Sequence, residues 1–175
     1  MKKIYTILLV LMMSVSAMAQ HEIGAVLGGM NGLSYKYWCS NNFALQADLA
    51  VGLTRIVGGQ YYKGNQLTSG DMGAYDFTIN PNVLYHWQLP ENFKIYAGGG
   101  ASFGLVSNIN NTDPDGVMGK FGLNAAVGAT YDLQEVPLTF ALDFRPGYGL
   151  GFQKADFPHL SYFDWKLAFA IRYRL

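Results

Sequence analysis

The chain has 175 residues, of which 50% are hydrophobic, and its 12 Lys+Arg balance 12 Asp+Glu. This balance excludes a basic surface for nucleic acid, so we expect no nucleic-acid partner. A single cysteine, Cys39, and three scattered histidines exclude an internal disulfide and a histidine metal cluster as supports of the fold. We therefore expect neither a cofactor nor a bound metal.

The first part of the chain, residues 1–19, predicts export. Two lysines near its start precede an apolar run, and the segment ends in Ala17-Met18-Ala19. These are the three parts of a secretory signal peptide. The apolar run is shorter than the roughly 20 residues that a retained membrane helix needs. We expect cleavage before Gln20, a location in the cell outer membrane, and one domain over 20–175.

After Gln20 the residues alternate between apolar and small or polar with a period of two, which predicts β-strands. Strands over 22–28 and 33–38 flank Asn31-Gly32, a dipeptide typical of a tight hairpin turn. A third strand over 43–54 follows a short polar turn. The Gly-, Gln- and Ser-rich residues 57–73 then predict a long loop.

The second half of the chain repeats this rhythm. A fourth strand over 74–89 contains Pro81, which cannot donate to a ladder and predicts a bulge or a local break. Further strands are predicted over 93–105 and 121–133, separated by a polar loop. The last two strands cover 138–152 and 164–175, separated by the long connection 153–162.

The connections predict how the strands are arranged. At one end they are short, near Ser40, Glu91 and Glu135, and at the other end most of them are long. Transmembrane barrels pair short periplasmic turns with longer outer loops in this way. The even number of strands places both termini on the inner side of the membrane.

The two faces of the strands carry opposite chemistry. In the terminal strand Trp165, Phe169 and Tyr173 share one face, and Lys166 and Arg172 take the other. A soluble barrel needs a large apolar filling and a charged exterior. Across the strands, the large apolar face carries one charge, Arg55, at a strand end from which it can snorkel to the headgroups. The other face carries the remaining strand charges and is otherwise small or polar, so we expect lipid outside. The predicted fold class is all-β, an eight-stranded antiparallel up-and-down transmembrane barrel.

Charged residues of the inward phase carry both signs, and we expect them to pair inside the barrel, because a buried charge without a partner is costly. They are Glu22, Lys36, Asp48, Lys94, Asp132, Asp143, Arg145, Asp164, Lys166 and Arg172. Aromatic residues towards the strand ends predict girdles at the membrane interfaces. They are Tyr35, Tyr37, Tyr85, Trp87, Tyr131, Trp165 and Tyr173.

With its signal peptide, its loop rhythm and segments such as Gly32-Leu33-Ser34-Tyr35-Lys36-Tyr37 and Ile171-Arg172-Tyr173-Arg174-Leu175, the chain resembles a known family. This family is the small eight-stranded outer-membrane barrels of Gram-negative bacteria, which include outer-membrane protein X and the transmembrane domain of outer-membrane protein A. The resemblance implies contact with outer-membrane lipid and lipopolysaccharide, and recognition of the C-terminal strand by the barrel-assembly machinery. Family members commonly end in an aromatic residue, from which Leu175 departs.

The interior of an eight-stranded barrel is just filled by its own side chains, so we expect no wide pore. Inward glycines are expected to make room for large neighbours such as Tyr96 and Arg145. The favoured function is that of a non-enzymatic outer-membrane protein whose outer loops serve interaction or envelope integrity. The alternative is a minor channel or carrier for small apolar solutes.

His159 and Ser161 form the one candidate catalytic pair. Two positions apart on a strand, they share a face, where the imidazole can act as a base for the hydroxyl. The pair is similar to the His-x-Ser of the outer-membrane lipid A deacylases, and this resemblance implies a lipid A acyl-chain hydrolase as a second alternative. No Glu follows downstream, which leaves Asp164 as the acid that would orient the base.

Overall fold

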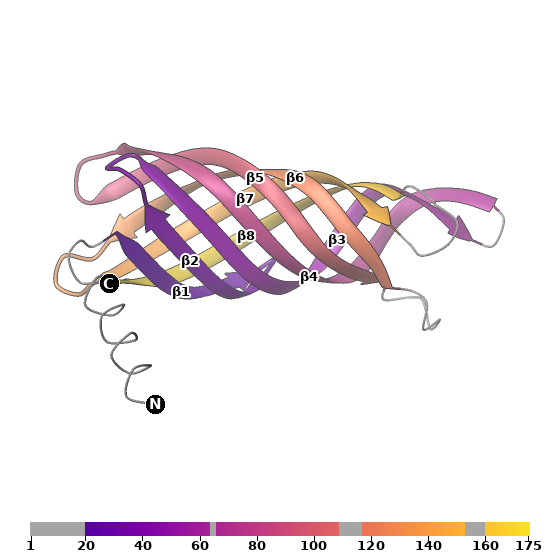
Figure 1. Ribbon diagram of the computed structural model, residues 1–175, viewed down its shortest axis with the longest axis horizontal. Coiled ribbons are helices and arrows are strands. Elements are labelled where there is room, and N and C mark those ends of the chain that lie inside the picture. Colours follow the sequence, from indigo (N-terminus) through magenta and orange to yellow (C-terminus); the bar gives the residue numbers. More distant parts are fainter. Residues whose placement is uncertain (1–19, 64–65, 109–116, 153–159) are drawn as a thin grey trace, which may run out of the picture.

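The computed structural model describes residues 20–63, 66–108, 117–152 and 160–175. In it, eight antiparallel strands close into a barrel in chain order (Figure 1). The strands are β1 (His21–Gly28), β2 (Asn31–Trp38), β3 (Phe43–Lys63), β4 (Gln66–Gln88), β5 (Phe93–Asn108), β6 (Val117–Asp132), β7 (Leu138–Phe152) and β8 (Leu160–Arg174). The predicted up-and-down barrel is confirmed. Residues 1–19 lie outside the described residues, so the signal peptide stays a prediction. Within the described part of the chain, no helix is long and apolar enough to cross a membrane.

The turn between β1 and β2 lies earlier in the chain than the sequence predicted. Asn31 and Gly32 already belong to β2, and the turn is made by Gly29 and Met30. Asn31 closes this turn through its side chain, which accepts from the Gly28 N–H at 3.1 Å and donates to the Gly28 carbonyl at 3.2 Å. Gly28 takes the positive φ of 113° that the turn requires.

Because β1 and β2 are short, the barrel wall has fewer strands beyond their turn. There β3 pairs directly with β8, through Val57 and Phe163. The turn itself is tied to the wall by Gly29, whose N–H donates to the Leu167 carbonyl at 2.8 Å. The barrel is therefore closed by β1 and β2 at one end and by β3 against β8 at the other.

The predicted loop over 57–73 is wrong, because most of it is strand. β3 and β4 pair as far as Lys63 and Gln66, with one register shift between Ile56 and Gly59. The pairing of β4 with β5 begins only at Ala74, so the end of the β3–β4 hairpin projects beyond the barrel (Figure 1). We call residues 59–63 and 66–70 the ribbon. Backbone pairing with one neighbour is enough to form the ribbon beyond the wall. Its sequence therefore lacks the alternation of apolar and polar residues that the wall strands show.

Pro81 breaks one ladder without causing a bulge. On the β5 side, the pairs Ile79–Phe103 and Asn82–Gly100 keep the same register across the gap. On the β3 side the pairing continues through Pro81 itself. The missing N–H of proline therefore removes local pairing on one side only, and no extra residue is inserted.

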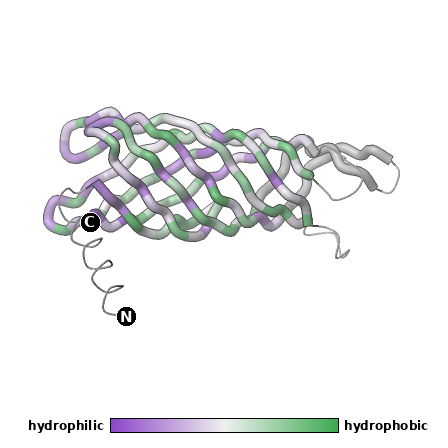
Figure 2. Tube along the Cα trace, in the orientation of Figure 1, coloured by the Kyte–Doolittle hydropathy of each residue, from purple (hydrophilic) through white to green (hydrophobic). Residues whose placement is uncertain are grey.

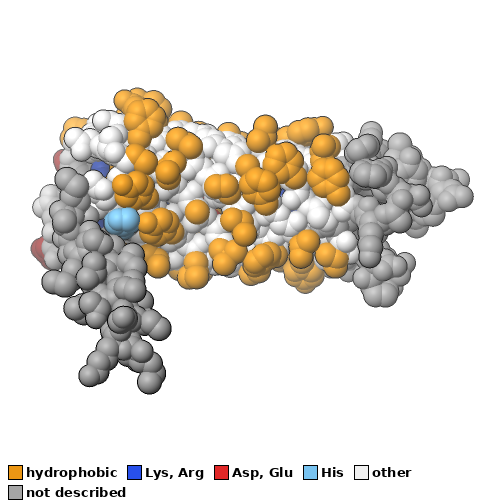
Figure 3. Space-filling view, viewed as in Figure 1, with side chains coloured by type: hydrophobic (Ala, Val, Ile, Leu, Met, Phe, Trp, Pro, Cys, Tyr) orange, Lys and Arg blue, Asp and Glu red, His pale blue; other side chains and the backbone are white. Residues whose placement is uncertain are grey.

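The wall is apolar outside and polar inside, as predicted. Large apolar side chains such as Leu33, Leu142 and Phe169 are exposed on the outer face, at 61%, 53% and 41%. Along the wall, hydrophobic residues are interspersed with hydrophilic ones (Figure 2). On the visible face, apolar side chains cover the wall, and charged ones gather near the end that carries the C-terminus (Figure 3). Of the predicted girdle, Tyr35, Trp87, Trp165 and Tyr173 are exposed aromatic side chains.

The first prediction tests the lipid-facing phase. Phe169→Arg places a cation on the outer face between the levels of Tyr173 and Trp165, and should destabilise the inserted barrel by about 2–4 kcal/mol. Val136→Arg, in the short turn between β6 and β7, should cost only about 0–1 kcal/mol, the value for the interface. Refolding into lipid vesicles, followed by heat-dependent gel mobility, measures both. Phe169→Ala controls for the loss of the ring, and equal effects of the two arginines would contradict the assignment.

Candidate functional site

The interior of the barrel gathers most of the charged side chains that the structure describes. All ten predicted inward charges face it, and two more join them, Asp76 of β4 and Lys120 of β6. The inward position of Lys120 was not predicted, because Lys120 lay in a predicted loop. Its spacing from Asn124 and Asp132 is nonetheless even, which places all three residues on the same face of β6. The sequence therefore predicted which face carries charge, and the structure shows which charges meet.

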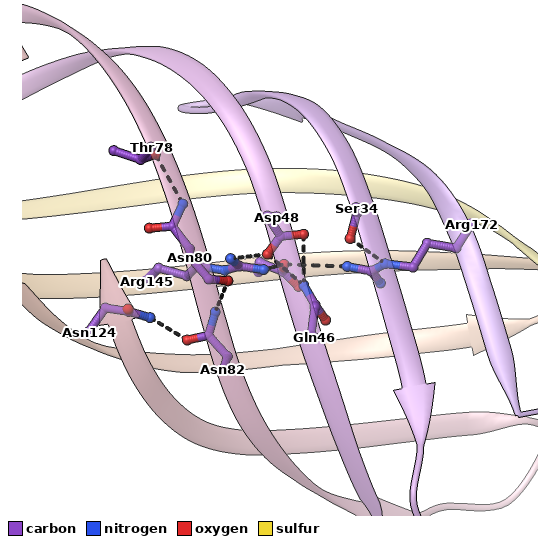
Figure 4. A network of polar contacts seen from close by, with 10 residues as sticks. Ser34, Gln46, Asp48, Thr78, Asn80, Asn82, Asn124, Arg145 and Arg172 are labelled. Carbon is purple, nitrogen blue, oxygen red and sulfur yellow. Dashed lines mark hydrogen bonds and ion pairs between the residues drawn. The ribbon is translucent and has the colours of Figure 1, made fainter. Parts of the chain in front are cut away.

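A network in the middle of the barrel joins opposite walls (Figure 4). Arg145 of β7 donates to Asp48 of β3 and to Asp143 of its own strand, at 2.5 Å each. Arg172 of β8 donates through Nε to the Ser34 hydroxyl of β2 at 2.9 Å, and its Nη2 lies 3.8 Å from Asp143. The link from β7 to β3 crosses the lumen, whereas the link from β8 to β2 spans only β1, whose Gly24 lies in register with both Arg172 and Ser34.

A second network lies towards the ribbon end. Lys120 of β6 donates to Asp76 of β4 at 2.9 Å and to Asp164 of β8 at 3.2 Å. Lys166 of β8 also pairs with Asp76. Two acids and two bases from three strands thus neutralise one another within the lumen. Between the two networks, beside Arg145, lies a cavity of about 20 Å³, room for about one water molecule.

Aromatic rings fill the interior towards the short-turn end. The Lys36 ammonium lies 5.5 Å from the Trp38 ring centre and 5.2 Å from that of Tyr96, distances typical of cation–π contacts. The His86 ring lies 4.4 Å from Trp38 and 4.9 Å from Tyr96. A Cβ at Gly128 would come within 2.5 Å of the Tyr96 hydroxyl, so this glycine makes room for a large neighbour as predicted.

The candidate catalytic residues are only partly placed. His159 lies outside the described residues. Ser161 belongs to β8, not to a loop as expected, and shares its phase with Phe163 and Trp165, which are exposed on the outer face. Asp164 has the opposite phase and is paired with Lys120 inside the barrel. Asp164 therefore does not face Ser161, and its role as the acid that orients His159 stays a prediction, because His159 lies outside the described residues.

Cys39 is an exposed free thiol in the turn between β2 and β3. Over the ranges that the structure describes, no three His, Cys, Asp or Glu side chains are grouped so that they could hold a metal ion. The described interior is filled by the two networks of ion pairs and by the rings of Trp38, His86 and Tyr96.

Comparison with solved structures relates this geometry to known barrels. Neisserial surface protein A aligns with a TM-score of 0.58 at 13% identity, over 89% of this chain and 93% of that one. The N-terminal β-barrel domain of Pseudomonas aeruginosa OprF aligns with a TM-score of 0.52 at 14% identity, over 87% and 95%. No protein-family model matches the sequence, and no curated protein matches it.

A closed barrel with an apolar exterior and an ion-paired interior is a transmembrane β-barrel. Within that class, the chain has the fold of the small eight-stranded outer-membrane barrels, as the resemblance of its sequence predicted.

The second prediction concerns the middle network. Asp143→Asn removes the charge between Arg145 and Arg172 and leaves the surplus cation buried, which should lower the free energy of unfolding by about 3 kcal/mol. Denaturant unfolding of the refolded barrel measures this loss. Glu135→Gln, in an exposed turn, is the matched control and should have no effect. An unchanged midpoint for Asp143→Asn would show that this carboxylate is solvated.

Proposed function

We propose that this protein is a non-conducting, non-enzymatic barrel of the outer membrane that acts through what it presents outside the membrane, in interaction or envelope integrity. The observation that carries the proposal is the closure of the lumen by ion pairs. Asp48–Arg145 joins β3 to β7 across the lumen, and at a second level Asp76–Lys120 joins β4 to β6, the two strands that flank β5. A solute would have to break buried pairs to pass, and each broken pair costs several kcal/mol.

The second support is the ribbon. Beyond Val57, β3 has β4 as its one ladder neighbour within the described residues, and residues 66–73 of β4 pair only with β3. At about 3.4 Å per residue, a ladder of five pairs projects roughly 17 Å from the wall. The ribbon therefore presents unpaired strand edges at the end opposite the short turns (Figure 1). Such edges recognise extended polypeptide.

The same fold supports the proposed location and partners. The exposed apolar wall suits outer-membrane lipid, and the projecting end suits contact with lipopolysaccharide. The C-terminal strand closes the barrel against β1, where the Leu175 N–H donates to the His21 carbonyl at 2.8 Å. Tyr173 and Leu175 are both about half exposed there, at 49% and 50%, and are the side chains that the barrel-assembly machinery would read.

The third prediction tests the closed lumen. Wild-type protein in planar lipid bilayers should show no stepwise conductance, because the pairs fill the lumen at two levels. The double variant Asp48→Ala, Arg145→Ala removes both partners of the central pair without leaving a lone charge, and should stay silent because the second network still closes the lumen. Adding Asp76→Ala and Lys120→Ala should open small conductance steps. The folding of both variants is checked by heat-dependent gel mobility. Conductance steps in the wild type, or a response to an apolar solute, would favour the channel or carrier instead.

The fourth prediction tests the ribbon. Replacing residues 59–70 by Asn-Gly shortens the hairpin and keeps the wall. Cells that carry this variant should become as sensitive to detergent and large antibiotics as cells without the protein, while the amount of folded barrel stays unchanged. The double variant of the third prediction should keep normal resistance. Full resistance with the shortened hairpin would remove the ribbon from the proposal.

Lipid A from the same cells separates the proposal from the deacylase alternative. Mass spectra should be identical with wild type, with Ser161→Ala and without the protein. Loss of an acyl chain with wild type alone would make the protein an enzyme.

A further inference from the structure

The short-turn end of the barrel contains a polar hollow of about 310 Å³. We call it the mouth. Its charged and aromatic lining is formed by Glu22, Trp38, Lys94, Asp132 and Arg174. This volume is at the lower end of the range for small-molecule sites. The mouth lies at the end of the barrel opposite the ribbon and is independent of the proposed function.

One carboxylate oxygen in the mouth lacks a protein donor. Glu22 is 1% exposed, and its Oε1 accepts from the Trp38 indole N–H at 2.7 Å. Its Oε2 is buried and makes no hydrogen bond to any described residue. Buried carboxylate oxygens are rarely left without a donor, because this costs the full desolvation of the charge. Glu22 is therefore set up to receive a donor from outside the chain.

The two cations in register with Glu22 on the neighbouring strands make no hydrogen bond to its Oε2. Lys36 pairs with Glu22 in register on β2, yet its ammonium lies between two rings. Arg174 pairs with Glu22 in register on β8, but its Nη2 donates to two carbonyls of the turn between β6 and β7, at 2.7 and 3.3 Å. Oε2 of Glu22 thus lacks a donor because neither Lys36 nor Arg174 donates a hydrogen bond to it.

The other side of the mouth has an excess of positive charge. Lys94 pairs with Asp132 at 2.8 Å and lies 4.6 Å from the centre of the Trp38 ring. Arg174 shares the same acid, with its Nη1 3.7 Å from Asp132. Two partly exposed cations thus face one carboxylate, which leaves N–H donors for an acidic group of a ligand.

We propose that the mouth binds a small zwitterion that carries both an ammonium and a carboxylate, of the size of an amino acid or a dipeptide. The ammonium donates to Oε2 of Glu22, and the carboxylate accepts from Lys94 and Arg174. A simple cation is disfavoured by the two nearby cations, and a simple anion by Glu22. Opposite charges at the two ends of one ligand satisfy both sides of the mouth.

The probe is the dipeptide Ala-Ala, titrated into the refolded mature chain in detergent micelles and followed by calorimetry and by the indole N–H resonance of Trp38. That resonance is assigned with Trp38→Phe. N-acetyl-Ala-Ala lacks the ammonium and Ala-Ala amide lacks the carboxylate. Each should bind about tenfold more weakly than Ala-Ala, or worse, because each leaves one charged group of the mouth unpaired.

Two variants locate the site. Glu22→Gln should weaken Ala-Ala about tenfold or more but not weaken N-acetyl-Ala-Ala, which no longer leaves a charged Glu22 unpaired, while the exposed Glu135→Gln should bind like wild type. If Glu22→Gln does not fold, Lys94→Met tests the site through the cation that would bind the ligand carboxylate. It should weaken Ala-Ala and leave Ala-Ala amide unchanged.

Three results would overturn the proposal. The first is an unperturbed Trp38 resonance at tens of millimolar dipeptide, which would mean that Oε2 of Glu22 is satisfied by water alone. The second is equal binding of the dipeptide and both blocked forms. The third is wild-type affinity in both folded variants. None of these results bears on the lumen or the ribbon.

Discussion

The constraint on which this structure depends is that hydrocarbon offers no partner to a backbone N–H or C=O. Every strand of the wall must therefore find two neighbours, and a sheet can do this only by closing. The chain meets the requirement in two ways along its length. At the short-turn end β1 completes the ring between β2 and β8, and beyond the turn at Gly29 and Met30 the ring is completed by β3 against β8. Even Pro81, which lacks an N–H, loses pairing on one side only.

Closure turns the usual polarity of a protein inside out, and this decides what the interior can be. Large side chains belong to the lipid-facing wall, so the lumen is left with charged, polar and small residues. In such a narrow space the charges lie close to one another and far from water, and neutralisation by opposite charge is the available solution. The pairs of Asp76 with two lysines and of Arg145 with two aspartates are that solution. The same pairs occupy the space through which a solute would have to pass.

In the proposed function the lumen is closed, so contacts with ligands or partners are made at the two ends of the barrel. One end carries the ribbon, whose strand edges have backbone groups to offer. The other carries the mouth, where Glu22 keeps one oxygen without a donor because Lys36 and Arg174 are held by other groups. The two ends differ in chemistry: backbone hydrogen bonding at the ribbon and charged side chains at the mouth.

The sequence by itself determined the class of fold and the face of almost every residue in the wall. A period of two leaves no freedom once lipid is outside, so Lys36, Asp143 and Arg172 could be placed inside from their positions alone. Their partners could not, because Arg145 meets Asp48 across the lumen from 97 positions away in the chain. The ribbon was missed because its ladder depends on backbone pairing beyond the wall, where hydrophobic alternation is no longer required. Only the tertiary structure decided that Asp164 pairs with Lys120 and that Glu22 lacks a second donor, because both depend on which neighbouring strands compete for the same side chains.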